Sequence, residues 1–131
     1  MPRFVLLYHE LPPGARPSHW DLMLERGDSL RTWALEQELR VGAEITCQAL
    51  PDHRLDYLDY EGPVSNHRGQ VTRVDRGTYE TLRESGEELL VRLDGRRFGG
   101  ELLMQNSPSK AGSGEANQSW VARFLRPESD A

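Results

Sequence analysis

The segment Ser18-His19-Trp20-Asp21-Leu22-Met23-Leu24-Glu25 decides the fold class, because its apolar side chains recur at every second position. Successive side chains of a β-strand point to opposite faces. One face would therefore be apolar, with Trp20, Leu22 and Leu24. The other face would present the imidazole of His19 and the carboxylate of Asp21, pointing the same way. This alternation predicts a strand with one face in a core and the other face available for chemistry.

Short stretches of a similar kind recur along the chain. We expect strands over residues 3–9, 18–25, 29–35, 43–50, 70–76, 87–93, 96–104 and 119–125. Turns separate them, with Arg26-Gly27-Asp28 before the third strand and Asp94-Gly95 as a hairpin turn. Gly77-Thr78-Tyr79 is expected to leave the fifth strand, and residues 52–60 to form a short helix or turn that ends at Gly62-Pro63. Many short strands with little helix predict a mainly β protein, an antiparallel barrel or sandwich.

The segments between these strands are predicted to be connections. Residues 10–17 contain three prolines and a glycine and should form a loop, and residues 36–42 a polar connection. Residues 107–118 are rich in Ser, Gly, Ala and Asn, which predicts a flexible loop, and residues 126–131 should form a polar tail. We expect a single domain over residues 1–131.

Composition limits the classes of function. The chain has 131 residues, 37% hydrophobic and 28% charged, with a formal net charge of −5. This acidic balance argues against a protein that grips long nucleic acid, since Lys and Arg drive phosphate binding. The single cysteine, Cys47, excludes an internal disulfide and fits a reducing compartment. No membrane-length apolar run or signal-peptide pattern occurs, so we expect a cytoplasmic protein without membrane contact.

His19 and Asp21 also form a candidate metal site. Two residues apart on one strand, they offer one nitrogen and one oxygen ligand from a rigid backbone. A third ligand would come from a neighbouring strand, and His9, at the end of the first predicted strand, is well placed. A solvated strand face would carry the same residues, so the pattern by itself keeps both interpretations open.

Several segments, in order, resemble the 3′-phosphoesterase domain of bacterial DNA ligase D. The resembling segments are Phe4-Val5-Leu6-Leu7-Tyr8-His9, His19-Trp20-Asp21-Leu22-Met23-Leu24-Glu25, Asp52-His53-Arg54-Leu55-Asp56-Tyr57-Leu58-Asp59-Tyr60-Glu61-Gly62 and Val74-Asp75-Arg76-Gly77-Thr78-Tyr79. The segment around His53 is the most specific of them. The resemblance extends from residue 3 to about residue 126.

The resemblance implies a small closed antiparallel β-barrel with one or two short helices and a manganese-dependent site. It implies removal of a terminal ribonucleotide or a 3′-phosphate from DNA ends in repair by non-homologous end joining. His9, His19 and Asp21 match the metal ligands of the family, and His53 and Tyr57 match its catalytic residues, which contact the phosphate. Each also has a structural interpretation, such as a turn residue for His53 and a half-buried core aromatic for Tyr57.

The chain departs from the family pattern around this site. Met23 stands where the family carries an arginine, and methionine cannot clamp a phosphate. Glu36-Gln37-Glu38 occupies a stretch that is basic in the family. Arg16 in the long loop, or Arg73 on a strand, is a candidate replacement for binding phosphate.

Three functions compete at this stage. The first is a manganese-dependent phosphoesterase acting on DNA 3′ ends or another phosphoester, with a repair ligase or polymerase as partner. The second is a non-catalytic, metal-containing module that binds DNA ends or a repair partner, and the third is a metal-free structural barrel. Two histidines and an aspartate suit Mn, Zn, Fe or Co. We expect a monomer by default.

Overall fold

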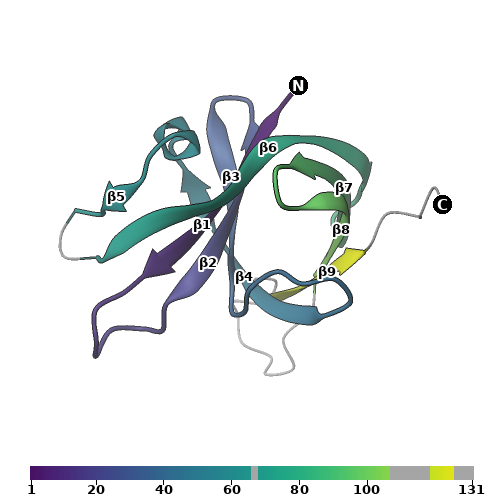
Figure 1. Ribbon diagram of the computed structural model, residues 1–131. Coiled ribbons are helices and arrows are strands. Elements are labelled where there is room, and N and C mark those ends of the chain that lie inside the picture. The colour runs from purple at the N-terminus through teal and green to yellow at the C-terminus, as the bar shows by residue number, and fades with distance from the viewer. Residues whose placement is uncertain (66–67, 107–118, 126–131) are drawn as a thin grey trace.

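The computed structural model describes residues 1–65, 68–106 and 119–125 (Figure 1). The strands are β1 (Arg3–Glu10), β2 (His19–Arg26), β3 (Ser29–Leu35), β4 (Glu44–His53), β5 (Gly62–Pro63), β6 (Gln70–Glu84), β7 (Glu88–Gly95), β8 (Gly99–Asn106) and β9 (Ser119–Leu125), with one 3₁₀ helix, η1 (Leu55–Leu58). The predicted loop at 107–118 and the predicted tail at 126–131 lie outside the described residues. Within the described ranges, no helix has the length and apolar character needed to cross a membrane.

Eight strands close into an antiparallel barrel, as the resemblance implied. Their order is β1-β2-β3-β4-β9-β8-β7-β6, and β6 pairs with β1 to complete the ring. The two-residue β5 pairs with β6 alone. Figure 1 shows β5 and η1 together outside the barrel, on the side of β1 and β6. The prediction of a mainly β chain with little helix is confirmed.

The inside of the barrel holds the main core. Alternation along β1 and β2 directs Phe4, Leu6, Leu22 and Leu24 inward, where they are at most 1% exposed. Trp33 is fully buried among them, and its ring meets that of Trp120 at 5.8 Å between centroids. Aromatic and aliphatic side chains together fill the interior of the barrel.

A second apolar cluster lies on the outer face of β1 and β2. Its buried members are Val5, Leu7, Met23, Leu30, Leu58 and Val71, and Leu55, Tyr57 and Val64 pack against them. The segment from η1 to β5 therefore covers this face of the barrel. On the outer face, Val5 and Leu7 of β1 and Met23 of β2 are apolar, and the polar site lies next to them, toward the end of β1 and the start of β2.

Strand β6 does not stop where the sequence predicts. It continues from Gln70 to Glu84, whereas we expected an end at residue 76. The reason lies at Gly77, where a Cβ would meet the carbonyl oxygen of Asp94 at 2.0 Å. Glycine here permits a close approach of β6 and β7, and it does not mark a turn.

The hairpin between β7 and β8 also turns later than predicted. Asp94 and Gly95 belong to the end of β7, and the reversal lies at residues 96–98. Asp75, 3% exposed, accepts hydrogen bonds from the backbone N–H groups of Arg96, Arg97 and Phe98 at 2.8–3.1 Å. A buried carboxylate from β6 thus outweighs the local preference of Asp-Gly for a two-residue turn.

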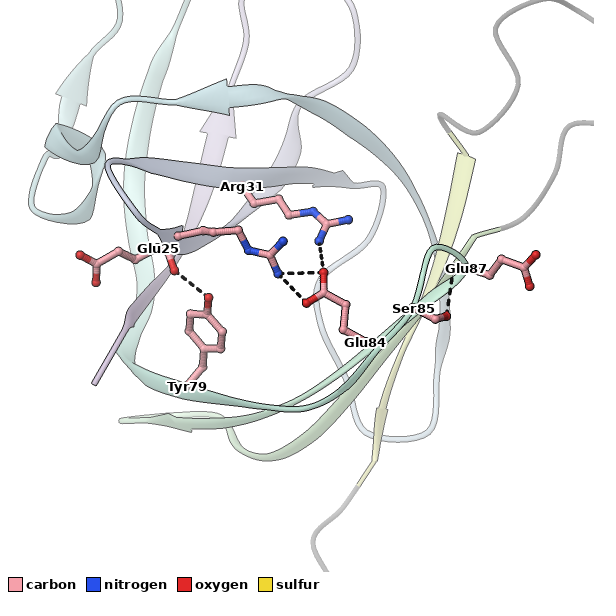
Figure 2. A network of polar contacts seen from close by, with 7 residues as sticks. Glu25, Arg31, Tyr79, Glu84, Ser85 and Glu87 are labelled. Carbon is pink, nitrogen blue, oxygen red and sulfur yellow. Dashed lines mark hydrogen bonds and ion pairs between the residues drawn. The ribbon is translucent and has the colours of Figure 1, made fainter.

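A network of polar contacts closes one end of the barrel (Figure 2). The carboxylate of Glu84 on β6 accepts hydrogen bonds from Arg26 at 3.0 Å and from Arg31 at 3.2 Å. The Tyr79 hydroxyl donates to the carbonyl of Glu25 at 2.7 Å. The long strand β6 therefore reaches across this end and is tied to the β2–β3 hairpin.

Candidate functional site

Three side chains meet on the outer face where β1 and β2 run side by side. His9 and His19 are paired in the β1–β2 register, and their rings lie 5.0 Å apart between centroids. Asp21 follows His19 by two residues and therefore shares its face. We call His9, His19 and Asp21 the triad. The structure brings together the three residues that the sequence proposed as ligands.

The triad holds its nitrogen and oxygen atoms at short range. His19 Nε2 lies 3.1 Å from Asp21 Oδ1, and His9 Nδ1 lies 3.4 Å from Asp21 Oδ2. The side chains of His19 and Asp21 are only 8% and 3% exposed. His19 Nε2 and Asp21 Oδ1 are buried, and among the described residues neither has a hydrogen-bond partner. Buried polar atoms of this kind need a partner, since leaving them unpaired is costly.

Backbone carbonyls fix which nitrogen of each ring carries hydrogen. His9 Nε2 donates to the carbonyl of Arg68 at 2.7 Å, and His19 Nδ1 donates to the carbonyl of Pro17 at 3.1 Å. A carbonyl only accepts, so both nitrogens carry hydrogen. In the neutral rings, His9 Nδ1 and His19 Nε2 then present lone pairs toward the Asp21 carboxylate. Hydrogen bonds of this second layer also orient metal-binding histidines in proteins.

The pKa values of His9 and Asp21 reflect this crowding. The neighbouring Asp21 carboxylate raises the pKa of His9, while burial works against that rise and the Arg68 carbonyl supports it. Burial works to raise the pKa of Asp21, but the adjacent imidazoles of His19 and His9 outweigh it and hold that pKa below its usual value. A proton on His9 and a negative charge on Asp21 therefore stabilise each other.

The donor set fits a divalent metal ion. One ligand atom from each residue lies within 4.8 Å of the other two. Ligands at about 2.0–2.2 Å from a shared ion lie about 3–3.5 Å apart, which is the range of the two contacts to Asp21. Two imidazole nitrogens and a carboxylate oxygen suit Mn, Zn, Fe or Co. The triad could hold such an ion, and these donors do not select among the four metals.

One extra residue in β4 aims His53 at the same face. Thr32 pairs with Leu50, but Leu30 pairs with His53, so Pro51 and Asp52 together stand opposite Arg31. A bulge of this kind shifts the alternation by one residue. His53 consequently shares the outer face with Leu50. Its Nδ1 donates to the carbonyl of Pro51 at 2.9 Å, which leaves Nε2 for other partners.

The helix η1 brings Tyr57 next to His53. We expected residues 52–60 to be a helix or turn, but β4 extends to His53 and only Leu55–Leu58 are helical. The spacing of four residues nevertheless places the two rings 5.6 Å apart, edge to face. A cavity of about 140 Å³ connects these residues with the triad and is lined by His9, Leu11, Arg16, Asp21, Met23, Leu50, His53, Tyr57, Val64, Arg68 and Val71. We call it the triad pocket.

Met23 lies in the apolar wall of the triad pocket and is 1% exposed. The two cationic candidates for binding phosphate differ in their surroundings. Arg16 lines the pocket, and its guanidinium has no hydrogen bond or ion pair within the described residues. Arg73 lies outside the pocket lining, with Glu61 at 3.6 Å from its guanidinium. Arg16 is therefore better placed than Arg73 to meet an anion in the pocket.

Sequence reasoning missed Arg68, which lines the same pocket. Its carbonyl orients His9, while its guanidinium donates to the backbone carbonyl of Ser65 at 2.9 Å and to the Ser65 hydroxyl at 3.2 Å. The only signal in the sequence is a basic residue before Gly69, which adopts a positive φ of 81°. Gly69 lies so close to the Glu10 carbonyl that a Cβ would meet it at 1.9 Å. This contact brings Arg68 back toward the end of β1.

The fold and the triad define a small closed β-barrel with a candidate metal centre on its outer wall. The chain belongs to the DNA ligase D 3′-phosphoesterase domain family, whose family model matches residues 13–106. This range contains His19, Asp21, His53 and Tyr57, while His9 precedes it.

Two curated relatives match over nearly the whole chain. They are the multifunctional non-homologous end joining protein LigD of Mycobacterium bovis and the multifunctional non-homologous end joining DNA repair protein LigD of Mycobacterium tuberculosis. Each is 29% identical over 136 residues, which covers 97% of this chain. The chain spans only 16% of the length of each relative.

Proposed function

We propose that this protein is a manganese-dependent phosphoesterase that removes a 3′-phosphate or a terminal ribonucleotide from DNA ends and leaves a 3′-hydroxyl. The observation that carries the proposal is the triad, with His19 Nε2 and Asp21 Oδ1 unpaired, at the edge of a pocket that also contains His53 and Tyr57. Membership of the ligase D phosphoesterase family supports the same reaction class. A repair ligase or polymerase would then be the natural partner, because such enzymes extend or seal 3′-hydroxyl ends.

His9, His19 and Asp21 would hold the ion, which when bound stabilises the negative charge that grows on the phosphoryl oxygens. The protein residues account for the remaining steps. Arg16 would contact a phosphoryl oxygen through its unpaired guanidinium. The Tyr57 hydroxyl would donate a hydrogen bond to another oxygen of the same group.

His53 would act as the general acid. Its Nδ1–H is occupied by the carbonyl of Pro51, so a proton on Nε2 is the one available for transfer. Water adds to phosphorus, the bond from phosphorus to the 3′ oxygen breaks, and His53 Nε2 gives its proton to that oxygen. The products are inorganic phosphate and a 3′-hydroxyl end. General acid catalysis of this kind contributes about 10²–10⁴-fold to the rate.

The first test measures phosphate release from a primer–template with a 3′-phosphate, with and without manganese. Wild type should release phosphate only with manganese, and His53→Ala should lose about 10²–10⁴-fold in rate while it still binds the metal. Arg54→Ala is the matched control, because Arg54 is exposed on the same segment and does not line the triad pocket. Equal rates for His53→Ala and wild type would refute the assigned role of His53.

A second candidate function is a non-catalytic module that binds DNA ends or a repair partner. The burial of Met23 in an apolar wall, where the family carries an arginine, favours it. The net charge of −5 points the same way. This candidate predicts that wild type binds manganese and a 3′-phosphate end but releases no phosphate.

The replacement of the family arginine is tested separately. Arg16→Ala should weaken binding of the phosphate end about tenfold or more, as expected for a charged hydrogen bond. Arg73→Ala serves as the comparison, because its guanidinium faces Glu61. Unchanged affinity and turnover in both variants would show that neither arginine replaces the family residue.

A further inference from the structure

A second hollow lies beside His19 and shares Arg16 with the triad pocket. It has a volume of about 410 Å³, and its lining includes Arg16, Ser18, His19, Ala34, Glu36 and Gln48. We call it the Ala34 hollow. His19 and Arg16 border it, and Arg16 also lines the triad pocket. The two spaces therefore meet at Arg16, and a candidate metal ligand lies in the lining of each, Asp21 in the triad pocket and His19 in the hollow.

The strand register explains why the hollow exists. Asp21 on β2 pairs with Ala34 on β3, and Ala34 pairs with Gln48 on β4. These three residues form one row across the outer face of the barrel. Neighbouring strands are about 4.8 Å apart, so the backbone of Gln48 lies about 10 Å from that of Asp21. Because the side chain of Ala34 between them is only a methyl group, the outer surface is depressed at this position.

The volume of each space indicates the size of the ligand group that it can hold. Pockets that hold small organic ligands typically measure about 300–1,000 Å³, and the Ala34 hollow at about 410 Å³ falls in this range. The triad pocket, at about 140 Å³, is smaller and suits a single phosphoryl group. A ligand with a compact anionic group and a larger attached body would fit both spaces together.

The charged groups around the two spaces determine which part of such a ligand binds in each. Glu36 places a carboxylate at the Ala34 hollow, which disfavours a second phosphate there. Within the described part of the chain, the side chains of Glu36 and Gln48 form no hydrogen bond or ion pair, so their polar atoms remain available to a ligand. The Ser18 hydroxyl accepts the N–H of Leu11 at 2.8 Å and keeps its own hydrogen to donate. These groups match the hydroxyls of a sugar and the polar edge of a base.

We infer that the Ala34 hollow binds the sugar and base of the nucleotide whose phosphate lies at the triad. This inference rests on the proposed function and adds the direction of the substrate across β2, β3 and β4. Ala34 gives the sugar room to approach the sheet. Glu36 accepts a hydrogen bond from a sugar hydroxyl or a base amine, and Gln48 offers both a donor and an acceptor to the base.

The test compares two probes in the presence of manganese, thymidine 3′-monophosphate and inorganic phosphate, by calorimetry. Wild type should bind the nucleotide at least tenfold more tightly than phosphate. Ala34→Leu, which fills the floor of the hollow, should remove most of that difference and change phosphate affinity less than twofold. Glu36→Gln should weaken nucleotide binding about threefold and leave the affinity for phosphate unchanged. Thr46→Leu is the matched control, since Thr46 is exposed on β4 and does not line the hollow.

The outcomes separate the inference from the proposed function. Equal affinities of wild type for both probes, or an unchanged difference in Ala34→Leu, would overturn the nucleoside site alone. A loss of both affinities in Ala34→Leu would also overturn it, because the effect would then act through the triad. Failure of wild type to bind even inorganic phosphate with manganese would refute the proposed function, and the nucleoside site with it.

Discussion

Asp21 and Asp75 are both buried in the barrel wall, at 2% and 3% exposed, yet their carboxylates have opposite surroundings. Asp75 accepts hydrogen bonds from three consecutive backbone N–H groups. Asp21 faces two imidazole nitrogens, and its Oδ1 has no hydrogen-bond partner of good geometry. A carboxylate whose hydrogen bonds are complete stabilises a turn. One left incomplete beside two histidines is suited to bind a cation.

Replacement of Asp75 tests the structural half of this comparison and has the largest expected effect. Asp75→Ala should lower the free energy of unfolding by about 3–5 kcal/mol, because three N–H groups lose a charged acceptor and an unpaired donor costs about 1–3 kcal/mol. Urea unfolding followed by circular dichroism measures it. Asp94→Ala is the control, since Asp94 is exposed near the same hairpin. Equal midpoints for the two variants would contradict a structural role for Asp75.

Replacement of Asp21 tests the functional half. Asp21→Asn should reduce manganese affinity at least about a hundredfold, because an anionic ligand is lost. The metal-free variant should change in unfolding free energy by less than about 1 kcal/mol, since the amide can donate to an imidazole lone pair. Calorimetric titration and urea unfolding give the two quantities. A stability loss as large as that of Asp75→Ala would make Asp21 a structural residue as well.

Gly95 lies directly against Asp75 and sharpens the comparison further. A Cβ there would meet Asp75 Oδ2 at 2.3 Å and the Phe4 ring at 2.7 Å. Gly95→Ala should cost about 1–3 kcal/mol of unfolding free energy, the usual range for overpacking a core. Gly99→Ala, at a position with nothing within 4 Å, should be nearly neutral. Similar stabilities of both variants would show that Asp75 and Phe4 can move apart without cost.

The pH dependence of manganese uptake tests the functional role of Asp21 without mutation. In the metal-free protein the pKa of His9 is raised above 6.5 by Asp21, so the proton on His9 stabilises the fold below pH 6.5. That contribution is lost as pH rises through the raised pKa. The ion displaces this proton, so manganese affinity should rise up to about tenfold per pH unit and level off above the pKa of His9. A plateau reached at or below pH 6.5 would contradict this coupling.

Replacement of Glu84 has the smallest expected effect on the free energy of unfolding. Its carboxylate is paired with Arg26 and Arg31, as the carboxylate of Asp75 is paired with N–H groups, but it is 38% exposed (Figure 2). Glu84→Gln should lower the free energy of unfolding by at most about 1 kcal/mol, because water screens exposed ion pairs. A loss near that of Asp75→Ala would show that complete pairing, without burial, suffices to make a carboxylate structural.

The sequence predicted the strands around the site but not the positions where pairing becomes irregular. The alternation of β2 placed His19 and Asp21 on one face, and the end of β1 placed His9 beside them. The extra residue in β4, the continuation of β6 past Gly77 and the delayed hairpin turn were not predicted. Each depends on a partner distant in the sequence, such as Asp75 for the turn at Arg96, and a local pattern carries no record of such a partner.

The bulge in β4 determines the face of the barrel on which the His53 side chain lies. Because side chains alternate at every residue, a regular ladder through Leu50, Pro51, Asp52 and His53 would turn the imidazole of His53 toward the barrel interior. The bulge, in which Pro51 and Asp52 together stand opposite Arg31, keeps His53 on the outer face opposite Leu30. Deletion of Pro51 or Asp52 would remove the bulge and still leave His53 opposite Leu30, so the direction of the imidazole depends on the number of residues between Leu50 and His53, which a comparison of residue types alone would overlook.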